Sequence, residues 1–261
     1  MLVSKKAHKE IMNRKFYLIP VLVLSTLAGF AQAKKTTTDV QQIWLGFFNQ
    51  SRLTNKLGLW GDFHLRTKED FATNFSQSIA RVGLTYYVND ATKLTAGYAY
   101  ISHYPAEGHN GVTQPEHRPW QQVQWHNKYA KTRMMQWIRL EERYRHKILN
   151  DSTLASGYNF NFKLRYNLFY EIPFSQKPTN KFSFVVNDEV HVNFGKQIIY
   201  NYFDQNRFFL GFKFNTASHD NIQLGYMNLF QQLPAGNRYR NNHVIRLFYF
   251  QNLDLRRKKV R

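Results

Sequence analysis

Large apolar residues alternate with polar ones along residues 158–174, YNFNFKLRYNLFYEIPF. Every second residue from Tyr158 to Phe174 is large and apolar, and the residues between them are mostly polar or charged, with Phe169 as the exception. A period of two places the two sets on opposite faces of a β-strand, which a helix could not do. The alternation runs for about twice the four to eight residues usual in a soluble sandwich.

A bilayer accounts for this length. A tilted strand that crosses a membrane needs about 9–11 residues with apolar side chains outward and polar ones inward, with aromatic residues near its ends. Residues 158–174 fit this description, and the same pattern recurs along the chain. We therefore predict an all-β fold, a transmembrane antiparallel up-and-down β-barrel.

Eleven alternating segments follow a polar lead, and their separators are alternately short and long. Short periplasmic turns and longer external loops are typical of outer-membrane barrels. The segments are residues 42–50, 57–67, 76–88, 93–104, 118–129, 133–146, 158–174, 181–195, 206–215, 221–232 and 242–253.

The expected number of strands depends on which side of the membrane holds the two ends of the barrel. If both ends of the barrel lie in the periplasm, closure requires an even number of strands. Either the lead at residues 34–41 supplies a strand or passes through the lumen, or one segment is divided wrongly. We predict about 12 strands, with 10 as the alternative.

The first 33 residues have the layout of a secretory signal peptide. A basic start precedes an apolar run at residues 16–30 and an Ala31-Gln32-Ala33 end. The run is shorter than the roughly 20 residues of a membrane helix. We expect a signal peptide at 1–33, a barrel at 34–255 and a basic tail at 256–261, located in the cell outer membrane. The expected partners are the export translocon, the barrel-assembly machinery and membrane lipid.

Composition supports a barrel over a helical membrane protein. Hydrophobic residues make up 43% and aromatic residues 16% of the 261, yet mean hydropathy is only -0.55. The absence of cysteine excludes disulfides, thiolate metal sites and a lipid-anchored N-terminal cysteine. The net charge of +19 raises the question of nucleic acid, but about half of the excess lies at the termini and the rest is spread along the strands. We predict no nucleic-acid partner.

The polar parity, which would face the lumen, is rich in charge, and cations outnumber anions. Isolated charges in a narrow lumen are costly, so neighbouring strands should pair them. We favour this ion-pair lattice over a basic lumen that attracts a small anionic solute. At 10 to 12 strands any pore would be narrow. The predicted lattice is Arg139, Glu141, Arg143, Arg145, Lys163, Arg165, Glu171, Glu189, His191 and Arg207, and Asp62, His64, Arg66, Arg81, Lys213 and Arg246 share its parity.

Two carboxylates, Glu142 and Asp188, fall on the apolar face. A β-bulge, or a position beyond the bilayer edge, would explain them.

The last strand also continues past the aromatic Phe250 into a basic cluster, so the alternation does not define where this strand ends.

No candidate chemical group has the spacing that its chemistry needs. Ser183, Asn187 and His191 share one strand face, but residues four apart lie about 13 Å from each other, too far for a nucleophile and its base. A histidine-rich segment without tight ligand spacing indicates solvated side chains more than a metal site. We predict no catalytic residue, no metal ligand and no cofactor. That segment contains His103, Glu107, His109 and His117.

Several short motifs together resemble those of a family of Gram-negative outer-membrane β-barrel proteins described only as a domain of unknown function. The likeness covers most of the mature chain and implies fold and location, but no activity, ligand or catalytic residue. The motifs are PEHRPWQQ at 115–122, RLEERYR at 139–145, LRYNLFYEIP at 164–173, NDEVHVNFG at 187–195, FDQNRFFLGFKF at 203–214, LGYMN at 224–228 and NNHV at 241–244.

The expected function is that of a non-catalytic narrow channel, or of a binding or structural scaffold, with an Arg-rich lumen. The alternative is an outer-membrane-embedded enzyme acting on lipid or lipopolysaccharide.

Overall fold

Eleven strands close into a β-barrel in the computed structural model, which describes residues 34–105, 111–177, 179–216 and 220–256. The signal peptide predicted at 1–33 and most of the basic tail lie outside these residues. The described residues include no helix that is both long and apolar enough to cross a membrane.

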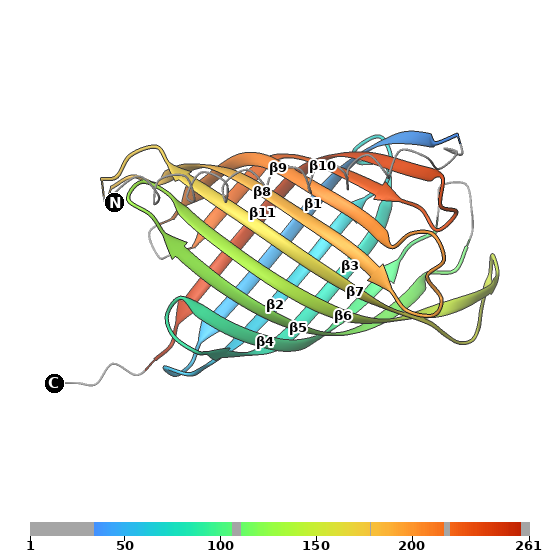
Figure 1. The fold of residues 1–261 in the computed structure, drawn as a ribbon, viewed down its shortest axis with the longest axis horizontal. Helices are drawn as coiled ribbons and strands as arrows, with labels where there is room; N and C mark the ends of the chain where they lie inside the picture. Colours follow the sequence, from blue (N-terminus) through green and yellow to red (C-terminus); the bar gives the residue numbers. More distant parts are fainter. Residues whose placement is uncertain (1–33, 106–110, 178, 217–219, 257–261) are drawn as a thin grey trace, which may run out of the picture. The chain divides into compact units, whose positions relative to one another are not determined.

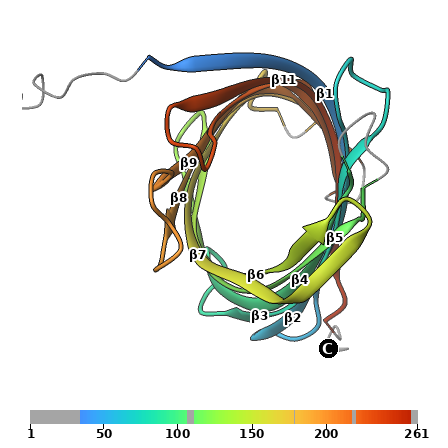
Figure 2. The same ribbon diagram turned by 90° about the vertical axis from the view of Figure 1, so that its right-hand side faces the viewer.

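Each strand pairs with its neighbours in sequence, and the ribbon forms a complete ring of strongly slanted strands (Figures 1 and 2). The predicted barrel fold is confirmed. The strands are β1 (Thr36–Arg52), β2 (Leu57–Thr67), β3 (Phe75–Tyr87), β4 (Thr92–His103), β5 (Gln114–Lys128), β6 (Arg133–Asn150), β7 (Thr153–Pro173), β8 (Phe182–Phe194), β9 (Phe203–Asn215), β10 (Asn221–Gln232) and β11 (Arg238–Asp254).

The predicted count of 12 strands, and the alternative of 10, are both wrong. The ring closes where β1 pairs with β11 in parallel, from Thr36 opposite Arg238 to Arg52 opposite Asp254. A parallel closing pair places the start of β1 and the end of β11 at opposite ends of the barrel, so an odd number of strands can close. The lead at residues 34–41 supplies no separate strand, because β1 already begins at Thr36.

The two ends of the barrel differ. We call the end with the connections 53–56, 88–91, 129–132, 174–181 and 216–220 the turn end, and the opposite end the loop end. The predicted loop at 147–157 is wrong, because β6 and β7 continue as a hairpin with only residues 151–152 between them. This hairpin extends beyond its neighbours, at the right of Figure 1.

Among the other strands, β5 and β9 also begin earlier than predicted. β5 begins at Gln114 instead of Arg118, because strand pairing to β4 continues through Pro115 and Pro119. β9 begins at Phe203, where a register shift beside His191 brings the strand back into pairing with β8. Both changes add charged residues to the barrel interior.

The faces of the strands follow the predicted alternation. Large apolar side chains project outward around the whole ring; Val82 and Leu84, for example, are 64% and 70% exposed. The inward parity holds the buried polar residues, and it also holds two apolar clusters. One cluster includes Trp44, Phe209 and Phe248. The other includes Trp60 and Trp120.

Glu142 and Asp188 lie on the outward face without a bulge at either position, so the predicted explanation by bulges is wrong. Each is instead hydrogen-bonded by an amide on a neighbouring strand. Asn206 Nδ2 donates to Asp188 Oδ1 at 2.7 Å, and Gln121 Nε2 donates to Glu142 Oε1 at 3.4 Å. Asp188 is at the centre of β8.

Candidate functional site

A continuous series of ion pairs crosses the inner wall of five neighbouring strands, β5 to β9. Because the side-chain period is two, acids and bases at inward positions of adjacent strands come to lie side by side. We call this series the ion-pair ladder. Its successive pairs are Glu116–Arg118 (2.5 Å), Arg118–Glu141 (2.9 Å), Glu141–Arg165 (2.6 Å), Arg165–Glu189 and Glu189–Arg207 (3.4 Å).

Further ion pairs branch from the ladder or lie beside it. Each of their carboxylates pairs with a largely buried cation, so the charges are compensated inside the wall. The pairs are Arg143 with Glu116 (2.8 Å), Lys163 with Asp204 (2.6 Å), Lys213 with Glu171 (2.8 Å) and Arg81 with Asp62 (2.8 Å).

The structure brings most residues of the predicted lattice close together, but they do not all form ion pairs. Some bond mainly to neutral groups. Arg139 bonds chiefly to an amide: its Nε atom donates to Gln122 Oε1 at 2.9 Å, and its Nη1 atom is 3.9 Å from Glu141. Arg145 leaves its Nε atom without a hydrogen-bond partner among the described residues. His191 lies 2.9 Å from Glu189.

Sequence reasoning missed three ladder or branch residues, Glu116, Arg118 and Asp204. Glu116 and Asp204 fall outside the predicted segments, which begin at Arg118 and Asn206. The signal was present for Glu116 and Arg118, which share the parity of the polar positions farther along β5.

A second group of inward cations is held by aromatic rings and neutral amides. We call Arg66, Arg139 and Arg246 the ring-held arginines. Stacking on a ring fixes a guanidinium without neutralising its charge. Their Cζ atoms lie 3.6 Å from the Trp44 ring, 4.3 Å from the Trp120 ring and 3.4 Å from the Phe209 ring, and their amide partners are Gln77, Gln122 and Gln223.

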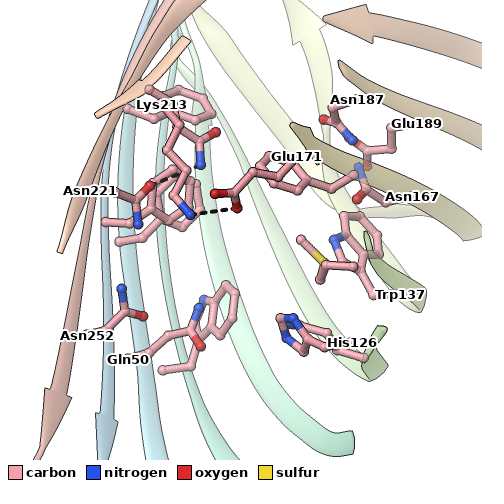
Figure 3. A pocket seen from close by; sticks show the side chains of 18 of the residues that line it. Gln50, His126, Trp137, Asn167, Glu171, Asn187, Glu189, Lys213, Asn221 and Asn252 are labelled. Atoms are coloured by element: carbon pink, nitrogen blue, oxygen red, sulfur yellow. Dashed lines mark hydrogen bonds and ion pairs between the residues drawn. The ribbon is translucent and has the colours of Figure 1, made fainter. Parts of the chain in front are cut away.

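A cavity of about 580 Å³ occupies the turn-end half of the interior. Its inner part is lined by the ring-held arginines and by Arg165 and Glu189 of the ladder, and its outer part by exposed residues such as Lys128 and Arg133 at the turn end. Figure 3 shows Lys213, Glu171, His126 and Gln50 around this space. The cavity therefore opens at the turn end.

Several side chains in the loop-end half are fully buried. Glu116, Asn193 and Val244 are at most 1% exposed, and none of them lines the cavity. Glu116, Arg143, Lys163 and Asp204 of the ladder and its branches lie in this part of the barrel, and so do apolar side chains such as Leu229. The cavity is thus open toward the turn end, and fully buried side chains lie beyond its inner end.

The cavity is strongly basic. Eleven Arg and Lys side chains of the described residues line it, against three carboxylates, Glu171, Glu189 and Asp254. A low-dielectric wall around such an excess of one sign concentrates counter-ions of the other. Aromatic residues share this wall, among them Phe48, which the sequence analysis missed, and Phe169, the exception noted in the alternation of β7.

An ion pair fixes one cation beside the cavity opening. Arg52 Nη1 donates to Asp90 Oδ1 at 2.8 Å, in the turn between β3 and β4. This hydrogen bond lowers the pKa of the Asp90 carboxyl below its usual value. Asp90 thereby holds Arg52 at the opening.

The residues considered for catalysis or metal binding do not come together in one site among the described residues. Ser183 Oγ donates to Glu171 at 2.9 Å, whereas His191 lies beside Glu189, so each has its own partner on the wall. His103 bonds to Glu116 inside the barrel, and His117 bonds to Tyr98 on the outer face. Glu107 and His109 lie outside the described residues. Within the described part of the chain, no three His, Asp or Glu side chains are grouped to hold a metal ion.

These features define a closed up-and-down β-barrel with an apolar outer face, an ion-paired interior and a basic cavity open at one end. The chain belongs to the family described as protein of unknown function (DUF2490), whose model matches residues 41–240. Comparisons with curated proteins and with solved structures find no match.

Proposed function

We propose that this protein is an integral outer-membrane barrel that binds small anions in its lumen and has no catalytic role. The outward ring of apolar residues supports membrane insertion, because soluble proteins rarely expose continuous apolar surface beyond a few hundred Å². Tyr98, Tyr100, Tyr144 and Tyr158 toward the loop end fit the aromatic girdle of a membrane interface. Short turns favour a periplasmic turn end.

The difference between the two halves of the interior favours a binding function over that of an open channel. The ion-pair ladder continues along the wall on the loop side of the cavity, and the basic cavity opens at the turn end. Such a lumen suits binding more than rapid through-flow, since a channel needs an aqueous path from end to end. The protein would therefore hold an anion that enters from the periplasmic side.

Location is tested by fractionation. The protein should sediment with outer membranes, require detergent for extraction and migrate differently on gels before and after heating. Recovery of a freely soluble monomer without detergent would contradict membrane insertion.

Anion binding is tested by tryptophan fluorescence, because Trp44, Trp60 and Trp137 line the cavity. Iodide should quench the folded protein more strongly than caesium does, and the difference should shrink in Lys93→Gln, which removes one lining cation. A matched control is Lys56→Gln, a change in the exposed β1–β2 turn. Equal quenching by the two ions would contradict a basic, anion-binding cavity.

Through-flow is tested in planar bilayers. The wild-type protein should show no steady open conductance. A stable conductance at neutral pH would contradict closure by the ion-pair ladder.

A further inference from the structure

The arginines around Trp44 lie in one part of the cavity. Arg246, Trp44 and Arg66 are in register across β11, β1 and β2, since Trp44 lies opposite both arginines in the strand pairing. Arg66 and Arg207 also lie over the same Trp44 ring, at 3.6 and 5.0 Å. Like charges held this close favour an anion between them.

Two buried donors in this region have no partner. The Nε atoms of Arg66 and Arg246 are buried without a hydrogen-bond partner among the described residues, and Arg246 is 7% exposed. A buried polar group without a partner costs free energy that a bound acceptor would recover. Both side chains line the cavity. This inner end of the cavity is therefore built to receive an anionic group.

Between these arginines and the turn end, four apolar side chains form part of the wall. Phe48 and Phe250 are paired across β1 and β11 and stack with ring centroids 4.4 Å apart. Phe169 of β7 and Met135 of β6 also line the cavity, at inward positions nearer the turn end than the ladder. We call these four residues the apolar collar. A hydrated inorganic anion makes no favourable contact with such a collar, whereas an aromatic or aliphatic group does.

We infer that the cavity binds an amphipathic organic anion, with its charged group on Arg66 and Arg246 and its aromatic or aliphatic body in the apolar collar. This inference rests on the proposed anion-binding function and adds the class of ligand. The cavity volume of about 580 Å³ is in the range of small-molecule sites.

The experiment is isothermal titration of the purified full chain in non-ionic detergent with three probes. 1-Naphthalenesulfonate carries both parts, methanesulfonate only the charged group, and 1-naphthalenemethanol only the ring system. Titrations into protein-free micelles are subtracted. We expect 1-naphthalenesulfonate to bind at least tenfold more tightly than either of the other probes.

Variants test where the charged group and the ring system of 1-naphthalenesulfonate bind. Arg246→Gln should weaken 1-naphthalenesulfonate binding at least tenfold, and Phe250→Ser should weaken it while leaving methanesulfonate binding unchanged. Arg240→Gln is the matched control, because Arg240 is an inward arginine of the same strand that does not line the cavity. Arg246→Lys keeps the charge if the glutamine variant fails to fold, and it should still weaken binding because it lacks the planar fork.

The outcomes separate the inference from the proposed function. Equal affinity for 1-naphthalenesulfonate and methanesulfonate would overturn the amphipathic ligand and leave small-anion binding intact. Equal affinity for 1-naphthalenesulfonate and 1-naphthalenemethanol would overturn the role of the arginines. Failure of all three probes, together with equal quenching by iodide and caesium, would overturn both proposals.

Discussion

Arg165 Nη1 donates to Glu141 Oε1 at 2.6 Å inside the barrel wall, where their side chains are 8% and 1% exposed. Because Arg165 also pairs with Glu189, one guanidinium bridges two buried carboxylates. Removing one member of a buried ion pair is far more damaging than losing a surface pair, since the remaining charge is poorly solvated.

Arg165→Gln should therefore lower the free energy of unfolding by about 3–5 kcal/mol. The measurement is urea unfolding in lipid vesicles or detergent. Arg133→Gln is the control: Arg133 is 58% exposed and 3.7 Å from Glu171, so its loss should cost less than about 1 kcal/mol. Equal losses for the two variants would contradict the ladder as a buried, compensated network.

The parallel closure of the ring can be tested with engineered cysteines, because the chain has none of its own. Leu45 of β1 lies opposite Leu247 of β11, and both face outward. Leu45→Cys combined with Leu247→Cys should form a disulfide on mild oxidation, visible as a mobility shift on a non-reducing gel.

Leu45→Cys combined with Leu253→Cys provides the control, because Leu253 lies opposite Ser51, six residues farther along β1. This pair should remain unlinked. Crosslinking in the control but not in the paired variant would mean that β1 and β11 have another register.

Trp120 requires a glycine on the neighbouring strand. A Cβ atom at Gly97 would lie 2.8 Å from Trp120 ring atoms and 2.2 Å from the Val82 carbonyl oxygen. Gly97→Ala should therefore lower the free energy of unfolding by about 1–3 kcal/mol or impair folding. Gly61→Ala should have no such effect, since a Cβ at Gly61 meets nothing within 4 Å. Thermal unfolding of the two variants compares them directly.

Asp188 gives a test of the membrane proposal that is independent of fractionation. It faces outward from the centre of β8, and a charge at that depth of a bilayer is costly. Asp188→Asn keeps an oxygen for Asn206 and removes the charge, so it should raise stability in lipid vesicles by up to about 1–2 kcal/mol. No change in vesicles would indicate that β8 does not face hydrocarbon at this point.

The acidic end of the pH range tests the contact at the cavity opening. Because the folded-state pKa of Asp90 is lowered, the Arg52–Asp90 pair contributes stability above the ordinary pKa of the carboxyl and loses it as pH falls through the lowered value. In Arg52→Gln the pKa of Asp90, followed by NMR, should rise toward its ordinary value. An unchanged titration would contradict the contact.

Local alternation was enough to predict the inward position of residues such as Arg165 and Glu189, because the side-chain period of a strand depends only on its own backbone. It was not enough for Glu116 and Asp204, whose assignment to the wall depends on pairing by neighbouring strands past Pro115 and past the register shift between β8 and β9. Phe169 occupies an inward position by the same parity, but this single exception did not predict the other apolar side chains of the lumen.

The sequence by itself determined that the chain forms amphipathic strands and which face of each strand is apolar. Only the tertiary structure decided that β1 closes against β11 in parallel, that the count is eleven among the described residues, and that arginines divide between carboxylates and rings. The physical reason is that these features depend on register between residues as distant as Trp44 and Arg246, and a two-residue period contains no information about register between strands.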